Sequence, residues 1–339
     1  MRTIAFFNNK GGVGKTTLTY HLAWMFHRLG LRVLVADLDP QANLTAAFLD
    51  DEEIEGLWAD NPSRSIYGAV EPIIERLGDL ATPYVQEVGG SFLSSEAGIG
   101  LIPGDLALAR FEDRLALAWP MCLDDNPSNA RDAFRVMTSF HRALHAAGDS
   151  REAQIALIDV GPNLGALNRA ALVSSDAVIV PLAADLFSLR GLRNVGRALA
   201  EWREGWKTRK ERPHAAGVLL PSGTMQPLGY VVLQHAARRA NEPARAYKRF
   251  TDRFPGEFHA ALLDDSAPAG ADPYQLSLLR HYRILLPLAM EARKPVFELK
   301  AADGAIGSHA ATGKDAYAAF AELAQMIASR LGITFGQPL

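Results

Sequence analysis

Cysteine is almost absent from this sequence, since Cys122 is the only one among 339 residues. A single thiol excludes a disulfide framework within the chain, and it excludes the paired cysteines that would hold an iron–sulfur cluster. The sequence also lacks an apolar run near the roughly twenty residues that a membrane-spanning helix needs. No signal-peptide pattern precedes the first motif. We therefore expect a cytoplasmic protein that does not bind membranes.

Neither sign of charge is in excess, because 35 Lys and Arg residues face 38 Asp and Glu residues, for a formal net charge of −3. Any binding to nucleic acid would therefore need a local basic patch. Hydrophobic residues make up 48% of the chain, which is enough to bury a large core. We expect a single domain over residues 1–335, with surface insertions near 50–100, 203–227 and 254–273, where Pro, Gly or charge accumulates.

A glycine-rich loop lies between a predicted strand, residues 4–7, and a predicted helix, residues 17–29. Its glycines let backbone N–H groups turn toward an anion, and the end of the helix favours the same charge. Lys15 would contact the β- and γ-phosphates of a nucleotide, and the Thr16 hydroxyl would bind Mg²⁺. The alternative is a turn that binds nothing. The predicted nucleotide-binding residues are Gly11, Gly12, Val13, Gly14, Lys15, Thr16 and Thr17.

Lys10 precedes the phosphate-binding lysine by five residues. Asn9 stands where the ordinary pattern G-x-x-x-x-G-K-[ST] has its first glycine, so the loop has a deviant form. Because Lys15 and the loop amides already surround the phosphates, Lys10 is better placed to serve a neighbouring subunit, as an arginine finger does. It therefore predicts a homodimer with nucleotide between the subunits. A solvated loop lysine is the alternative.

Three short apolar runs, residues 4–7, 33–36 and 155–158, predict buried strands. Stretches with helical periodicity, such as 131–147 and 189–202, alternate with them. Strands of this kind, separated by helices, are typical of parallel sheets that are covered on both faces. We therefore expect an α/β fold with a mostly parallel β-sheet flanked by helices on both faces.

Aspartates follow two of these strands. In an open parallel sheet, ligands bind outside the carboxyl ends of the strands, so Asp37, Asp39 and Asp159 should converge near the glycine loop. Asp159 is the candidate Mg²⁺ ligand beside Thr16, and Asp37 would lie in the outer shell of the metal. Asp37 or Asp39 could instead cap a helix that begins near Pro40.

Residues 10–17, Lys-Gly-Gly-Val-Gly-Lys-Thr-Thr, and 37–43, Asp-Leu-Asp-Pro-Gln-Ala-Asn, resemble the ParA/MinD family of deviant P-loop ATPases, and its ParA branch in particular. Segments 159–165 and 178–182 resemble the family's second acidic motif and its next strand. The resemblance spans about residues 2–330. It implies ATP and Mg²⁺ as cofactors, weak hydrolysis of ATP, and Asp39 as the residue that orients or deprotonates the attacking water.

The sequence departs from the family at two places. The usual Asp-x-Pro-Pro is Asp159-Val160-Gly161-Pro162, which leaves the coupling to hydrolysis in question. No asparagine follows the predicted strand 229–233, so the preference for adenine is implied by the resemblance alone.

The resemblance also implies an ATP-bound dimer that binds DNA non-specifically and associates with the nucleoid. A ParB-like partner would stimulate hydrolysis, and the cycle would partition or position a plasmid, a chromosome or other cargo. One alternative is an ATP-dependent ligase or synthetase of the same superfamily that acts on a small substrate. Another is a nucleotide switch that positions protein cargo without DNA.

Basic residues gather at 238–253, where six of them accompany two acidic ones. On a helix, several would share one face and contact phosphates without reading sequence. A second cluster lies at 203–212. A solvated charged face is the alternative for either cluster. The candidate DNA-binding residues are Arg238, Arg239, Arg245, Lys248 and Arg249.

Overall fold

The computed structural model describes most of the chain. The backbone is described for residues 1–60, 62–89, 98–235, 237–239, 242–243, 245–280, 282, 285–306 and 308–335. Side chains are described over the same ranges, except those of residues 234–247 and 308–310.

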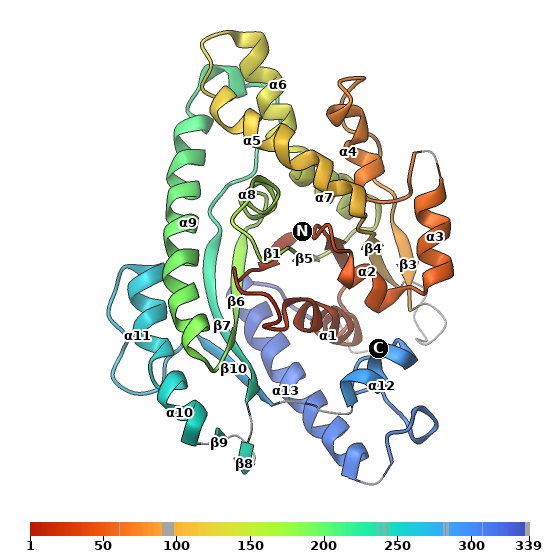
Figure 1. The fold of residues 1–339 in the computed structure, drawn as a ribbon, viewed down its shortest axis with the longest axis vertical. Helices are drawn as coiled ribbons and strands as arrows, with labels where there is room; N and C mark the ends of the chain where they lie inside the picture. Colours follow the sequence, from red (N-terminus) through yellow and green to blue (C-terminus); the bar gives the residue numbers. More distant parts are fainter. Residues whose placement is uncertain are drawn as a thin grey trace.

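Nearly continuous apolar runs form the central sheet. Its strands are β1 (Arg2–Phe6), β2 (Val33–Asp37), β3 (Gln86–Val88), β4 (Ile99–Ile102), β5 (Ile155–Asp159), β6 (Ala177–Ala183), β7 (Gln226–His235) and β10 (Gln275–Arg280). Their order is β10-β7-β6-β1-β5-β2-β4-β3 (Figure 1). All pairs are parallel except β3 with β4, at one edge. The predicted fold class is confirmed.

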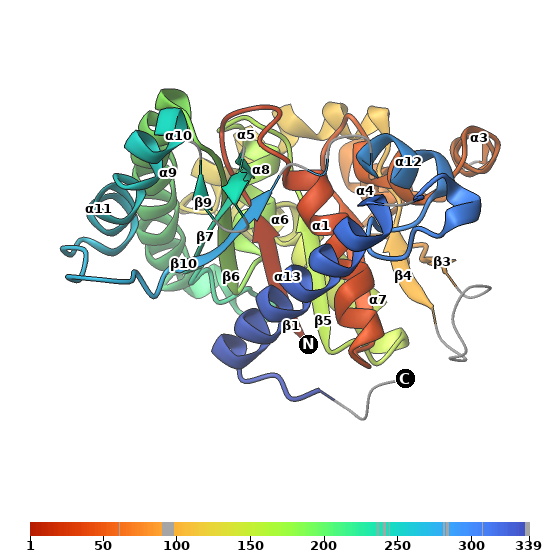
Figure 2. The same cartoon turned by 90° about the horizontal axis from the view of Figure 1, so that it is seen from below.

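Helices cover both faces of the sheet (Figures 1 and 2). On one face lie α1 (Lys15–Arg28) and α13 (Ser308–Leu331). On the other lie α5 (Phe111–Met121), α6 (Pro127–Met137), α7 (Ser139–Ser150), α8 (Ala166–Val173) and α9 (Leu186–Lys210). The remaining helices are α2 (Asn43–Phe48), α3 (Asp51–Ala59), α4 (Ile66–Ile74), α10 (Arg245–Thr251), α11 (Phe254–Phe258) and α12 (Leu285–Ala292).

Side chains alternate between the two faces of the sheet along each strand, and they form two apolar cores. In β1, Ile4 and Phe6 pack toward α1 and α13, whereas Ala5 packs toward α8 and α9. All three side chains are fully buried. Successive side chains of a strand point to opposite faces, so a strand covered on both sides must be apolar throughout. This burial fixes the strand ends that carry the polar residues.

The register of strand pairing places the carboxyl ends of β1, β2 and β5 side by side. β1 lies between β5 and β6, so the connections diverge there and leave a crevice. Phe6 pairs with Asp159, and Asp37 pairs with the same residue from the other side. The end of the strand that enters the glycine loop and the two aspartates therefore lie side by side.

The stretch predicted as helical at 131–147 is helical except at Thr138, which separates α6 from α7 and whose hydroxyl donates to the carbonyl oxygen of Phe134 at 2.8 Å. The predicted surface insertion at 203–227 overlaps the end of α9, which runs to Lys210 and buries Trp206 completely, and the insertions stay a prediction. Within the described part of the chain, no helix combines the length and hydropathy needed to cross a bilayer.

Candidate nucleotide site

The glycine loop joins β1 to α1. Gly12 and Gly14 have φ values of 71° and 87°, in the left-handed region that glycine favours. Gly14 is the N-cap of α1, and no described side chain caps this helix, so its first amides are left for an anion. The Nζ atom of the buried Lys15 lies 3.5 Å from the carbonyl oxygen of Lys10. Burial lowers the pKa of Lys15, and two nearby aspartates oppose this shift.

Lys10 is held within its own chain. Its Nζ forms an ion pair with Asp185, which follows β6 and caps α9. Partial burial acts to raise the pKa of Asp185, but the hydrogen bond from Lys10 holds it below its usual value. The amide of Lys10 also donates to Oδ1 of Asn8 at 3.0 Å. A role for Lys10 across a subunit interface requires it to leave Asp185, and that role stays a prediction.

Asp159 ends β5 and is fully buried. Its Oδ2 accepts a hydrogen bond from the Thr16 hydroxyl at 2.6 Å, whereas its Oδ1 has no hydrogen-bond partner among the described residues. Burial raises the pKa of Asp159 to about 8, and the neighbouring Asp37 adds to the rise. A buried, unpartnered carboxylate oxygen beside a hydroxyl fits Mg²⁺, because a cation would offset the cost of burying the negative charge.

Asp37 ends the neighbouring strand, but its carboxylate is engaged elsewhere. Its Oδ2 accepts hydrogen bonds from the amide and the hydroxyl of Thr45, at 2.8 and 2.7 Å, in the first turn of α2. Burial raises the pKa of Asp37 to about 6. Asp37 thus caps a helix, as the alternative had it, although that helix begins at Asn43 rather than near Pro40. Its place in the outer shell of a metal stays a prediction.

Asp39 faces the same cavity as Lys15 and Thr16. Its Oδ1 accepts a hydrogen bond from the amide of Gln41 at 3.0 Å. A Cβ atom added to Gly161 would lie 3.3 Å from this oxygen, so the glycine that replaces the expected proline leaves room beside Asp39. The arrangement fits a carboxylate that orients a water molecule.

A cavity of about 540 Å³ lies over the loop, and Asp39 and Pro162 are among the residues that line it. Leu233, at the end of β7, closes against the loop, since a Cβ atom on Gly14 would lie 3.0 Å from its Cδ1. The cavity joins an anion-binding end to an apolar side, as a nucleotide requires. The apolar side includes Leu286, Ala289 and Met290 of α12.

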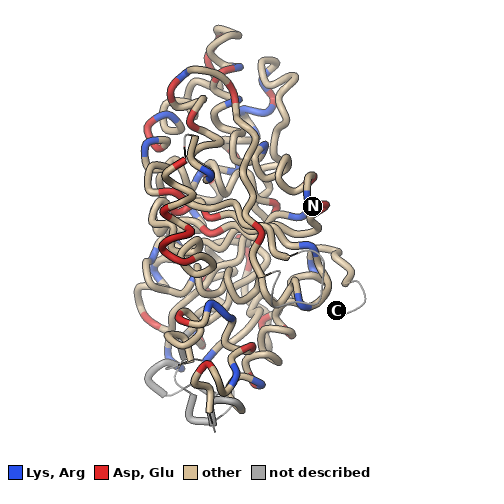
Figure 3. Tube along the Cα trace, turned by 90° about the vertical axis from the view of Figure 1, so that its right-hand side faces the viewer, with Lys and Arg blue, Asp and Glu red and all other residues tan. Residues whose placement is uncertain are grey.

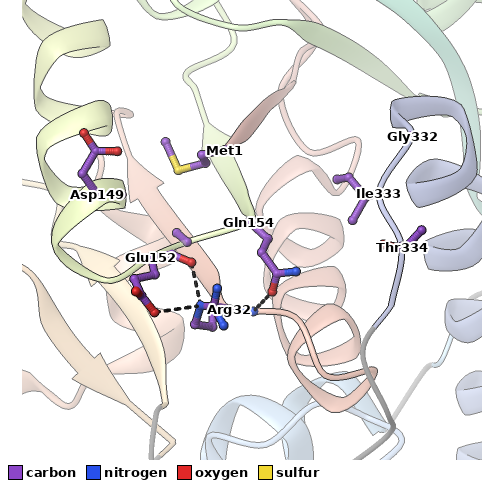
Figure 4. Close-up of a pocket in the computed structure, with 10 residues that line it drawn as sticks. Met1, Arg32, Asp149, Glu152, Gln154, Gly332, Ile333 and Thr334 are labelled. Atoms are coloured by element: carbon purple, nitrogen blue, oxygen red, sulfur yellow. Dashed lines mark hydrogen bonds and ion pairs between the residues drawn. The ribbon is translucent and has the colours of Figure 1, made fainter.

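A second hollow, of about 570 Å³, lies at the opposite ends of the strands (Figure 4). Met1, Arg32 and Gln154 line it, and they directly precede β1, β2 and β5. The Arg32 side chain donates to the carbonyl oxygen of Glu152 at 2.6 Å, and the Arg32 amide donates to Gln154 at 3.0 Å. Because ligands of open parallel sheets bind at the carboxyl ends of strands, this hollow is not the nucleotide site.

His21 lies on the second turn of α1, after the glycine loop. Its Nδ1 lies 2.7 Å from the carbonyl oxygen of Thr17, and its Nε2 accepts from the amide of Val296 at 3.2 Å. The ring therefore has a neutral tautomer with both nitrogens bonded, and it stacks on Phe320. Burial lowers the pKa of His21 to about 4.

The buried neutral imidazole predicts acid sensitivity. The imidazole of His21 binds a proton near pH 6.5 in the unfolded chain but only near pH 4 in the folded chain. Its contribution to the stability of the fold is therefore complete above pH 6.5 and is lost as the pH falls toward 4. We expect the free energy of unfolding of wild type, taken relative to that of His21→Leu, to fall by about 2.5 kcal/mol between pH 7.5 and pH 4.5. Urea unfolding measures it, with His214→Leu as control. A constant difference would contradict the neutral, buried state.

The first basic cluster is not one helical face, so that prediction is wrong. Arg238 and Arg239 lie in a short strand, β8 (Ala237–Arg239), which pairs with β9 (Glu242–Pro243), and the helix α10 begins only at Arg245. The side chains of these three arginines lie outside the described residues. Lys248 and Arg249 are exposed on α10, and Lys248 pairs with an aspartate one turn later at 3.0 Å.

Several residues of the second basic cluster form contacts within the chain. Arg209 is only 6% exposed, stacks 3.8 Å from the ring centre of Trp119 and donates to a backbone carbonyl. Arg203 and Lys210 also donate to backbone carbonyl oxygens, in residues 222–225. Elsewhere, residues of both signs are interspersed along the chain (Figure 3). Lys248 and Arg249 are thus the candidate DNA-binding residues whose exposure the structure describes, and contact with DNA by any of the five candidates stays a prediction.

The sequence interpretation missed Asn8 and Asp185, which position the loop lysine. Asp185 had a usable signal, because an aspartate between a predicted strand and a predicted helix is a typical N-cap. Asn8 had none beyond its position before the glycines.

A strand that runs through an uncapped, glycine-rich turn into a helix, with carboxylates at the adjacent strand ends, defines a P-loop nucleotide-binding protein. A family model described as an AAA domain matches residues 1–209 of the chain. Together with similarity to curated partitioning proteins, this match shows that the chain belongs to the ParA/MinD-type family.

Three relatives illustrate the similarity. Protein IncC of Escherichia coli is 32% identical over 204 residues, which are 60% of this chain and 47% of IncC. The chromosome partitioning protein ParA of Caulobacter vibrioides is 28% identical over 211 residues, 62% of this chain and 67% of that protein. An ATP complex of a McdA variant from Cyanothece is 15% identical, with a TM-score of 0.63 over 98% of this chain and 97% of that chain. At that identity the last likeness shows the fold alone. The chain spans about half the length of IncC.

Proposed function

We propose that this chain binds and hydrolyses Mg²⁺-ATP as a switch that drives partitioning or positioning of DNA or other cargo. One observation carries the proposal: Lys15, Thr16 and Asp39 line a single cavity at the uncapped end of α1, and the buried Asp159 accepts a hydrogen bond from the Thr16 hydroxyl there. A buried lysine, a hydroxyl and a carboxylate with a free oxygen are the groups that a nucleoside triphosphate and its metal require.

Each residue has a distinct role in this reaction. Lys15 and the amides at the start of α1 bind the phosphates. Thr16 and Asp159 hold Mg²⁺, which when bound neutralises charge on the phosphate oxygens. Asp39, which lines the same cavity, orients the attacking water. Because positioning and electrostatics supply most of the catalysis in phosphoryl transfer, a misplaced group lowers the rate strongly.

The rate of the isolated chain is low in this account because Lys10 is paired with Asp185. In an ATP-bound homodimer, Lys10 leaves that pair and contacts the phosphates of the partner subunit. The surface beside Lys10 suits a second copy: Phe187, whose ring centre lies 5.9 Å from the Lys10 Nζ, is 73% exposed, and the adjacent Leu186 is also exposed. Large apolar side chains that gather around a site typically mark an interaction surface.

Non-specific DNA binding by the dimer rests on α10. Arg249 is exposed, and its guanidinium lies 4.5 Å from the ring centre of Phe250. A dimer would present two copies of this helix to one DNA molecule, so that two local basic contacts act together although the formal net charge is −3 per chain. A ParB-like partner protein then stimulates hydrolysis and releases the dimer from DNA.

Turnover of ATP measured with and without plasmid DNA tests the proposal. We expect DNA to stimulate wild-type turnover, and we expect Arg249→Glu to weaken ATP-dependent DNA binding and to reduce the salt slope by about one. Arg131→Glu, an exposed substitution on α6 at the far end of the molecule (Figure 1), serves as control. Equal turnover with and without DNA, together with an unchanged gel shift, would contradict the DNA role and favour a cargo switch or a ligase.

A further inference from the structure

The segment that follows Asp159 is folded by one buried side chain. Asn168 of α8 is 1% exposed, and its amide group donates to the carbonyl oxygens of Gly161 and Asn163 at 2.8 and 2.7 Å. Oδ1 of Asn163 in turn accepts from the amide of Gly165 at 2.9 Å. This segment carries Pro162 over the glycine loop, 4.0 Å from where a Cβ atom of Gly11 would lie. Its conformation therefore shapes the wall of the nucleotide cavity.

The far end of the segment is held by a residue from a different element. The helix α8 begins after Gly165, which has no side chain with which to cap it. Glu112 of α5 supplies the cap instead: its two oxygens accept hydrogen bonds from the amides of Ala166 and Leu167, at 2.5 and 2.9 Å. A carboxylate at the N-terminus of a helix is favoured both by the charge-assisted bonds and by the helix dipole.

Glycine at position 165 leaves room for this contact. A Cβ atom added there would lie 2.6 Å from Oε1 of Glu112 and 2.9 Å from Oδ1 of Asn163. Both distances are shorter than van der Waals contact, so a larger residue would displace the carboxylate.

We propose that Glu112 is a positioning residue for ATP hydrolysis, which holds the segment from Asp159 to Gly165 in the geometry that the cavity needs. The inference rests on the proposed ATPase function. Gly161 gives the backbone of the segment more conformational freedom than the proline of the Asp-x-Pro-Pro form would. The shape of the segment therefore depends on the hydrogen bonds from Asn168 to Gly161 and Asn163, and on those that Glu112 accepts at the start of α8. Since Glu112 lies on α5, a displacement of the segment at the phosphates also reaches that helix, where a partner protein could sense it.

Hydrogen exchange combined with kinetics tests the proposal. In Glu112→Gln, which keeps the size of the side chain but removes its charge, we expect the amides of Gly161 and of residues 163–167 to exchange about tenfold faster. We expect kcat to fall on the order of tenfold while the KM for Mg²⁺-ATP stays within about twofold, because the phosphate-binding groups are untouched. Gly165→Ala should produce the same pair of effects from the other side of the contact.

Asp113→Asn is the matched control, because Asp113 is the next residue on α5 and is exposed. It should change neither exchange nor kcat. Unchanged exchange in both test variants would overturn the anchor, and faster exchange with unchanged kcat would overturn its role in positioning. If wild type does not hydrolyse ATP, the proposed function fails, while the exchange comparison still decides whether Glu112 anchors the segment.

Discussion

Lys15→Ala is expected to abolish ATP binding at concentrations where wild type is saturated. Lys15 is 7% exposed and lines the cavity, where it would donate charge-assisted hydrogen bonds to two phosphates. Each such bond contributes about 1.5–3 kcal/mol, so their loss should weaken affinity by about 100-fold or more. Isothermal titration calorimetry with Mg²⁺-ATP measures the change.

Lys300→Ala provides a control for the loss of one positive charge, because Lys300 is exposed and follows α12 outside the cavity. It should bind ATP as wild type does. Wild-type affinity in Lys15→Ala, with an unchanged melting temperature, would mean that the glycine loop is not the nucleotide site.

Lys10→Ala is expected to bind ATP normally and to lose hydrolysis. In this account the lysine contacts the phosphates only across the dimer interface, so nucleotide affinity of the monomer does not depend on it. A cation supplied in this way contributes about 10³-fold or more to the rate, and we expect a loss of that order together with loss of the ATP-dependent dimer. Sedimentation velocity and a phosphate-release assay measure the two effects.

Asp185→Asn is the matched variant, because asparagine still caps α9 but no longer pairs with the Lys10 charge. We expect it to retain the dimer and hydrolysis. An unchanged ATP-dependent dimer in Lys10→Ala would contradict a role across the interface.

The parts of the site that are local in sequence could be predicted from it. Strands that are buried on both faces must be apolar, and the glycine loop must follow such a strand to reach the phosphates. Because neighbouring parallel strands end at the same edge, the order of strands and polar residues along the chain was enough to place Asp37, Asp39 and Asp159 near the loop.

Contacts made across the fold were beyond prediction. Glu112 reaches α8 over 54 residues of sequence, and no local pattern marks it as a cap. Arg209 belonged to an apparently exposed basic run, yet packing places its guanidinium on Trp119. The pairing of Lys10 with Asp185 depends on the crossover that brings β6 beside β1. In each case the partner is set by topology rather than by spacing.

Mixing two inactive variants shows whether Lys10 acts in the active site of the partner subunit. Asp39→Ala should bind ATP but not hydrolyse it, because the water is no longer oriented. In a mixed dimer of Lys10→Ala with Asp39→Ala, one site would combine the intact Asp39 of one protomer with the intact Lys10 of the other. We predict that phosphate release returns on mixing, to at most a quarter of the wild-type rate in an equimolar mixture, with the one intact Lys10 holding the mixed dimer together. If Lys10 acts within its own chain, every site in the mixture is defective, and the absence of any recovery would contradict the account.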